Sequence, residues 1–196
     1  MAKLSRDDLY TLEQYAEKRT QMRAAVMQHK KSRQLPIGPH ATLYFEDRLT
    51  MQYQIHEMLR VERIFEADAI EEALDAYHPG IPDGSNWKAT FMIEYPDVEV
   101  RQRELQKLVG IEDRVWMQVH GFDPVYAIAD EDLERSDAEK TSAVHFLRFE
   151  LSGEMAAAVR AGAQIGAGID QQNYHYSVDQ VAANIRDSLA RDLTAG

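Results

Sequence analysis

The sequence predicts an α+β fold, in which an antiparallel β-sheet packs with several helices in a single domain. Two features indicate this class. The first half of the chain shows the apolar repeat of helices, and the second half contains several consecutive segments with the alternation typical of strands. With 196 residues, the chain is long enough to bury one substantial core. We therefore expect one domain over 1–196, with an N-terminal amphipathic helix (1–33), a strand with the central helices (41–78) and an antiparallel sheet with flanking helices (85–196).

The first predicted element is the amphipathic helix. Ser5 followed by Asp8 has the pattern of an acidic capping box, and apolar residues recur at helical spacing as far as Lys30. The segment 34–39 ends this helix because it contains two prolines and a glycine. The basic run 29–33 could contact an anion or a partner, but a solvated helix end, where cations complement the helix dipole, is the favoured interpretation.

A strand over 41–45 leads into the central helix, for which Asp47 is the expected N-cap. At about 100° per residue, one face of this helix is apolar and must be buried. That face holds Met51, Ile55, Met58, Leu59, Val61 and Phe65. Arg48, Gln54 and Glu62 project into or beside the same arc. The opposite, solvent-facing side is expected to hold His56, Arg60 and Arg63.

The remaining elements follow from periodicity and from glycine and proline breaks. In order, they are a helix over 67–77, a strand over 87–95, a helix over 98–109, a hairpin of 114–120 with 125–129, a strand over 141–151, a helix over 153–161, a glycine-rich strand over 163–169 with close backbone approach, a polar loop over 170–176 and a helix over 178–193. In the strand 141–151, alternation places His145 on one face with Leu147, and Arg148 on the other.

Composition excludes several classes of function. The net charge of −11 repels phosphate backbones, so nucleic acid is not the expected partner. No apolar run is long enough to span a membrane. The absence of cysteine excludes disulfides and thiolate chemistry and fits a cytoplasmic location. Phosphate-binding, nucleophile-elbow and H-E-x-x-H motifs are also absent, so no cofactor is evident apart from a divalent metal held by carboxylates and histidine.

The polar residues of the central helix form the candidate site. A carboxylate such as Glu62 in an apolar arc costs several kcal/mol unless it is paired or ligated. In one interpretation, Glu62 pairs with an arginine from a neighbouring element and Gln54 satisfies backbone groups, which makes a structural network. Arg148 is the natural partner if its face of the strand receives the helix. In the other interpretation, the carboxylates converge with a histidine on a metal or small ligand, and this set is Glu46, Glu57, Glu62 and His145.

Long strings of the chain resemble a bacterial family known as domain of unknown function 3501. They are GPHATLYFEDRLTMQYQIHEMLRVERIF, IPDGSNWKATFMIEY, GIEDRVWMQV, YAIADEDLER and KTSAVHFLRFEL. Positions that match its most recognisable strings are Glu46, Arg48, Gln54, Glu57, Arg60, Glu62, His145 and Arg148. The chain departs from the family at 170–172, where Asp-Gln-Gln replaces Asp-His-Pro. The resemblance implies a gene neighbourhood with rubrerythrin and a cysteine-rich iron–sulfur oxidoreductase.

Two functional hypotheses follow. The first is a soluble, non-catalytic accessory or binding protein in peroxide or iron redox metabolism, with rubrerythrin-like and iron–sulfur redox proteins as the partners that the resemblance implies. The alternative is a metal-binding protein or enzyme with a Glu/His site on the central helix and the 141–151 strand. It requires Glu46, Glu57, Glu62 and His145 to converge within about 5 Å around a pocket. A homodimer is the expected oligomeric state.

Overall fold

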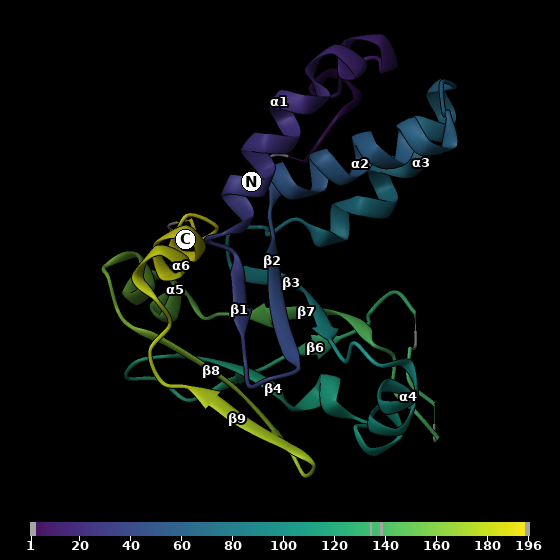
Figure 1. The fold of residues 1–196 in the computed structure, drawn as a ribbon. Coiled ribbons are helices and arrows are strands. Elements are labelled where there is room, and N and C mark those ends of the chain that lie inside the picture. The colour runs from purple at the N-terminus through teal and green to yellow at the C-terminus, as the bar shows by residue number, and fades with distance from the viewer. Residues whose placement is uncertain (1–2, 134, 138, 195–196) are drawn as a thin grey trace.

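The structure is a computed structural model that describes residues 3–133, 135–137 and 139–194. Two antiparallel sheets share one hydrophobic core, and helices lie around them (Figure 1). This arrangement confirms the predicted α+β class, with two sheets where one was expected. The α-helices are α1 (Leu12–Lys30), α2 (Arg48–Glu62), α3 (Ala67–Tyr77), α4 (Val98–Lys107), α5 (Gly153–Arg160) and α6 (Ala183–Ala190), and three short 3-10 helices are η1 (Arg6–Asp8), η2 (His78–Gly80) and η3 (Ile111–Arg114).

Each sheet has its own strand order. The first sheet runs β1-β2-β3-β7-β6 and the second runs β5-β4-β8-β9. The strands of the first sheet are β1 (Gln34–Pro36), β2 (Ala41–Glu46), β3 (Asn86–Ile93), β7 (Val144–Glu150) and β6 (Ile128–Ala129). Those of the second sheet are β5 (Val125–Tyr126), β4 (Val115–Val119), β8 (Ile165–Gln171) and β9 (Tyr174–Val178). The register aligns Glu46 with Lys88, and Lys88 with Arg148, in one row across three strands.

The main core lies between the two sheets and collects the inward-facing residues of their strands. It includes Leu43, Phe45, Trp87, Phe91, Leu147, Phe149, Val115, Met117, Ile165 and Ile169. Because side chains alternate along a strand, the row that contains Glu46, Lys88 and Arg148 points away from this core. The first sheet therefore has an apolar inner face and an outer face that carries charges.

The first three helices form an arm that projects from one end of the sheets (Figure 1). We call α1, α2 and α3 the helical arm. The arm has a second, smaller apolar cluster of Leu4, Met51, Ile55, Leu59, Ala73, Leu74 and Ile81. The predicted N-cap of α2 is confirmed, since the Asp47 side chain accepts a hydrogen bond from the Thr50 amide.

The end of α2 differs from the expectation. The helix ends at Glu62, and Arg63 takes a left-handed conformation with a φ of 54°. Val61 and Phe65, which the helical wheel placed on the buried face, are 71% and 62% exposed. For Phe65 the wheel was wrong because it continued the helical period past the point where the chain turns. Val61 lies in the last turn of α2, and its side chain is exposed there.

His56 is also misplaced by the wheel, which put it on the solvent-facing side. The residue is only 1% exposed. Its imidazole stacks between the rings of Tyr10 and Tyr15, with centroids 5.4 Å and 4.5 Å away. Because α2 packs against α1 as well as α3, two of its sides are covered, whereas a single amphipathic face describes only one.

Three local expectations have mixed outcomes. Ser5 and Asp8 do form a capping box, but it caps η1; α1 begins at Leu12 behind a second box made by Thr11 and Gln14. The strand β9 lies in a segment that was expected to be a polar loop. The close approach expected in the glycine-rich strand is present at Gly168, where a Cβ would overlap the Trp116 indole. Among the described residues, no helix has the length and apolar character needed to cross a membrane.

Candidate functional site

A cavity of about 430 Å³ lies between the helical arm and the outer face of the first sheet. Strands β2, β3 and β7 supply its floor. Its walls come from α2, the end of α3, η2 and the loop at 131–132. Apolar groups of Met51, Tyr77, Pro79 and Phe146 line it together with a few polar side chains. Three of the residues that the sequence singled out, Glu46, Gln54 and Arg148, meet at this cavity.

Glu46 is the most unusual of these residues. It ends β2, directly before the N-cap of α2, and it is 5% exposed. Its Oε1 accepts hydrogen bonds from Thr90 Oγ1 at 2.9 Å and from Gln54 Nε2 at 3.4 Å. Its Oε2 is buried without a hydrogen-bond partner among the described residues. A buried acceptor left in this way costs about 1–3 kcal/mol, and more when it is charged. A donor brought by a ligand would recover this cost.

Lys88 lies directly opposite Glu46 on the neighbouring strand. Opposite charges at such cross-strand positions usually attract each other. Lys88 nevertheless forms no ion pair within 4.0 Å with any residue that the structure describes, although it lines the same cavity. Burial, and then the neighbouring Arg148 guanidinium, lower the pKa of Lys88. The cavity therefore carries a carboxylate and an ammonium group that do not neutralise each other.

Arg148 does not pair with a central carboxylate, as the sequence had suggested. Its Nη2 and Nε each lie 2.8 Å from Glu131, and its Nη1 lies 2.5 Å from Glu150. These hydrogen bonds raise the pKa of Arg148, and they lower the pKa of Glu131. Arg148 is thus already matched by two carboxylates at the edge of the cavity.

Four other candidate residues on α2 lie away from this cavity. Arg48 pairs with Asp8 at 2.6 Å. Glu57 is held by Arg19 at 2.7 Å and by the Tyr15 hydroxyl at 2.5 Å, and the hydrogen bond from Arg19 lowers its pKa to about 2. The remaining two, Arg60 and Glu62, are exposed to solvent. The expectation that Glu62 is a buried carboxylate was therefore wrong, because α2 ends at that residue.

His145 is fully buried, but it lies on the core side of the first sheet, while Glu46 lies on the outer side. Its Nδ1 is 2.6 Å from Asp130 Oδ2, and its Nε2 is 2.8 Å from Thr141 Oγ1. Alternation along β7 separates it from the cavity. The structure does not bring Glu46, Glu57, Glu62 and His145 together, so the metal site expected from these four residues is not assembled.

A different group could be considered for a metal. Donor atoms of Glu112, Asp130 and His145 all lie within 4.8 Å of one another. Asp130 contacts Nδ1 of the imidazole, however, whereas Glu112 approaches Nε2 at 3.8 Å from the other side. Glu112 also accepts hydrogen bonds from Ser136 and Thr141. Both ring nitrogens and the carboxylates are engaged. This group therefore fits a structural network that joins Asp130, Ser136 and Thr141 to β7 better than it fits an ion site.

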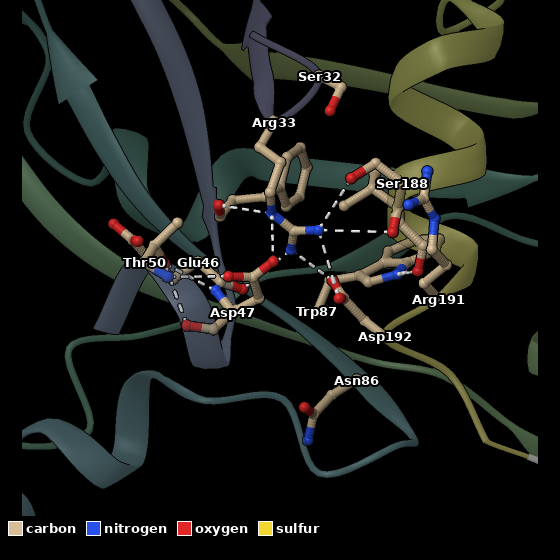
Figure 2. Close-up of polar contacts among 12 residues, drawn as sticks. Ser32, Arg33, Glu46, Asp47, Thr50, Asn86, Trp87, Ser188, Arg191 and Asp192 are labelled. Carbon is tan, nitrogen blue, oxygen red and sulfur yellow. Dashed lines mark hydrogen bonds and ion pairs between the residues drawn. The ribbon is translucent and has the colours of Figure 1, made fainter. Parts of the chain in front are cut away.

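A buried ionic network does exist, but around Arg33 (Figure 2). Arg33 is 2% exposed, and its Nη2 lies 2.5 Å from Asp192 Oδ2. It also donates to the carbonyl oxygens of Phe45 and Glu46, each at 3.0 Å, and to Ser188. The expectation that the basic run is a solvated helix end was wrong for Arg33, which joins the start of the first sheet to the end of α6.

The neighbours of this network complete its charge balance. His29 Nε2 lies 2.5 Å from Asp47 Oδ2, which in turn lies 3.5 Å from Arg33 Nε. Burial raises the pKa of Asp192 to about 6, although Arg33 opposes this rise. A second cavity of about 290 Å³ adjoins the network. No Arg33 or Asp192 side-chain atom is left buried without a partner there, so the network is structural.

Comparison with known proteins places the chain in a family. The pattern of the family described as Protein of unknown function (DUF3501) matches residues 3–193. The chain belongs to this family. It is also similar to a novel protein of unknown function from Burkholderia pseudomallei K96243, whose crystal structure superposes with a TM-score of 0.93 at 53% identity and covers 98% of this chain and 100% of that chain. No curated protein matches the chain. These relatives confirm the resemblance of the sequence and the fold, and their descriptions carry no activity.

Sequence reasoning missed Lys88 and Thr90 as members of the site. Both lie in a strand that was expected, on the face opposite Trp87. Their alternation with buried residues was visible in the sequence. Their approach to Glu46 was not, because it depends on the pairing of β2 with β3.

Proposed function

We propose that this family member is a non-catalytic binding protein that takes a small molecule into the cavity between the helical arm and the first sheet. The observation that carries this proposal is the buried, unpartnered Oε2 of Glu46 at that cavity. The ligand would carry a hydrogen-bond donor with a positive charge, because such a group satisfies a carboxylate best.

The dimensions and lining of the cavity support this proposal. Its volume of about 430 Å³ lies within the range of small-molecule sites, roughly 300–1,000 Å³. Its wall surface is mainly apolar, and Glu46, Lys88 and Thr90 on the sheet floor supply polar groups that can orient a ligand. Gln54, Glu131, Asp132 and Arg148 also line it. Between apolar walls, the attraction between a bound cation and the buried Glu46 carboxylate would be screened less by solvent and salt.

The test is the Glu46→Gln variant with phenethylamine as the probe, because this molecule combines an ammonium group with an apolar ring. We expect phenethylamine to raise the melting temperature of the wild type. We expect affinity to fall roughly ten- to hundredfold in Glu46→Gln, since a charged hydrogen bond is lost. Glu94→Gln is the matched control, because Glu94 bonds Thr42 and Tyr44 on the same sheet away from the cavity. Equal binding by Glu46→Gln and wild type would contradict the proposal.

The family resemblance adds a cellular setting to this proposal. We propose that the protein is an accessory in rubrerythrin-linked peroxide or iron redox metabolism, located in the cytoplasm, and that its partners are rubrerythrin-like and iron–sulfur redox proteins. A pull-down with both proteins that recovered neither would count against this setting. The homodimer also stays a prediction, which light scattering would check.

The metal-binding alternative makes a separate prediction. Because the geometry favours a hydrogen-bonded network around His145, we expect untagged protein purified without chelators to carry substoichiometric metal by mass spectrometry. Near-stoichiometric iron, manganese or zinc that is lost in His145→Ala would contradict this expectation and favour an ion held with Glu112. Retention of that metal in Glu46→Gln would separate the two sites.

A further inference from the structure

We infer that the ligand of the cavity is a zwitterion, an amino acid with a large apolar side chain, whose ammonium group binds Glu46 and whose carboxylate binds Lys88. This inference rests on the proposed function and extends it to the class of molecule that is bound.

Glu46 and Lys88 carry opposite charges at the cavity and do not pair with each other. Glu46 and Lys88 are register partners on adjacent strands, where Cβ atoms lie about 4.5–5.5 Å apart. Glu46 instead uses Thr90 and Gln54, and Lys88 has no ion pair among the described residues. Two neighbouring opposite charges that line one cavity and do not pair are complementary to a molecule that carries both charges at short separation.

The other charged side chains at the cavity already have close ion-pair partners. Glu131 is matched by Arg148, whose Nη2 is 2.8 Å away. Asp132 is matched by Arg135, at 2.7 Å. Lys88 is half-buried beside Arg148 and feels the carboxylates of Glu131, Asp83 and Glu150 without a close ion pair to any of them. A ligand with only a positive charge would satisfy Glu46 and give Lys88 no ion-pair partner. A zwitterion satisfies both groups and leaves the net charge of the cavity unchanged.

The walls of the cavity suit a large apolar side chain. Met51 of α2, Tyr77 at the end of α3, Pro79 and Phe146 give the cavity a largely apolar surface beyond the two charges. The small polar end of an amino acid would occupy the sheet floor, and its side chain would lie against these groups. Burial of apolar area would then contribute to affinity in proportion to the size of that side chain.

The experiment compares three probes that share one ring. They are L-phenylalanine, phenethylamine, which lacks the carboxylate, and 3-phenylpropionate, which lacks the ammonium group. Binding is measured by calorimetry for wild type, Glu46→Gln, Lys88→Gln and the control Lys107→Gln, since Lys107 pairs with Glu104 on the surface. We expect phenylalanine to bind the wild type most tightly. Each cavity variant should weaken phenylalanine roughly ten- to hundredfold.

The cross-pattern of the variants decides the outcome. Lys88→Gln should weaken phenylalanine and leave phenethylamine unchanged, whereas Glu46→Gln should weaken both. If phenethylamine binds through Glu46 but phenylalanine gains nothing from Lys88, the zwitterion is overturned and the proposed function stands. If no probe binds in a manner that depends on Glu46, both are overturned. Circular dichroism of each variant confirms that a loss of binding is not a loss of fold.

Discussion

Buried polar residues in this protein differ in how completely their polar atoms are hydrogen-bonded or paired. Arg33 is enclosed by acceptors from two distant parts of the chain, 45–46 and 188–192, and its charge is met by Asp192. Glu46 has one satisfied and one unsatisfied oxygen. His56 has an apolar surrounding and a buried Nε2 without a partner among the described residues. Arg33, whose polar atoms are fully hydrogen-bonded, therefore has a structural role. Glu46, which is only partly hydrogen-bonded and lies beside a cavity, belongs to the candidate site.

His56 should make stability depend on pH. Burial lowers its pKa from 6.5 to about 4, although the Glu57 charge opposes this effect. As pH falls from 6.5 to 4, the unfolded chain takes up a proton at His56 and the folded chain does not, so stability falls. The loss amounts to up to about 3 kcal/mol. We expect His56→Phe, which keeps a ring between the two tyrosines, to lose less stability than wild type between pH 7 and pH 4.5.

Urea denaturation at several pH values measures this difference. Wild-type and His56→Phe curves that run parallel from pH 7 to pH 4.5 would show that His56 does not titrate as its burial implies. The Glu57→Gln variant serves as a comparison. In the wild type, the Glu57 carboxylate has a pKa lowered to about 2, so the stability that it contributes should be lost only as the pH falls below about 4.5 toward 2.

At the scale of the elements, α1 has few buried residues for its length. It is 19 residues long, yet only Tyr15 and Val26 are buried. Its attachment to α2 is polar as well, since Arg19 and Tyr15 both bond Glu57. A helix with little buried apolar surface depends on such contacts, because most helical stability in proteins comes from tertiary contacts and not from intrinsic propensity.

We therefore expect Arg19→Ala to loosen α1 selectively. Amide hydrogen exchange in α1 should become several-fold faster, and exchange in β3 and β7 should stay unchanged. Arg23→Ala is the matched control, because Arg23 lies on the same helix and is exposed to solvent. Equal effects of the two substitutions would show that the pair with Glu57 does not hold the helix in place.

At the scale of the whole molecule, the described residues form two apolar clusters of unequal size. The larger lies between the sheets, and the smaller lies inside the helical arm. The cavity is bounded by both parts, with its floor on the sheet and its wall on α2 and α3. The arm and the sheets can therefore differ in local stability, because each has its own apolar cluster. That residues 1–196 form one domain stays a prediction.

Matched leucine substitutions test this arrangement. Leu43 is 0% exposed in the main core, and Leu59 is 3% exposed in the arm. We expect Leu43→Ala to lower the global unfolding free energy by about 2–5 kcal/mol. We expect Leu59→Ala to accelerate hydrogen exchange in α2 and α3 while the slowest amides of β3 and β7 keep their rates. Uniform acceleration across the sheets by Leu59→Ala would show a single cooperative unit.

The sequence by itself determined the local structure of this protein. Alternation predicted the strands around Trp87 and Phe149, and the cap at Asp47 placed the start of α2, because side-chain direction and capping act over a few residues. The same patterns singled out Glu46 and Gln54. They went wrong at Glu62 and His56, where the end of a helix and a second packing partner lay outside the repeat.

Only the tertiary structure decided which charges meet. Glu46 approaches Thr90 across 44 residues of sequence, and Arg33 meets Asp192 across 159. Such pairings follow from strand register and from how helices close over a sheet, and shifting a register by one residue would move every side chain to the other face. The tertiary structure thus separated His145 from the cavity and brought Lys88 to it. Alternation in the sequence predicts which residues share a face of a strand, but it does not predict which element packs against that face.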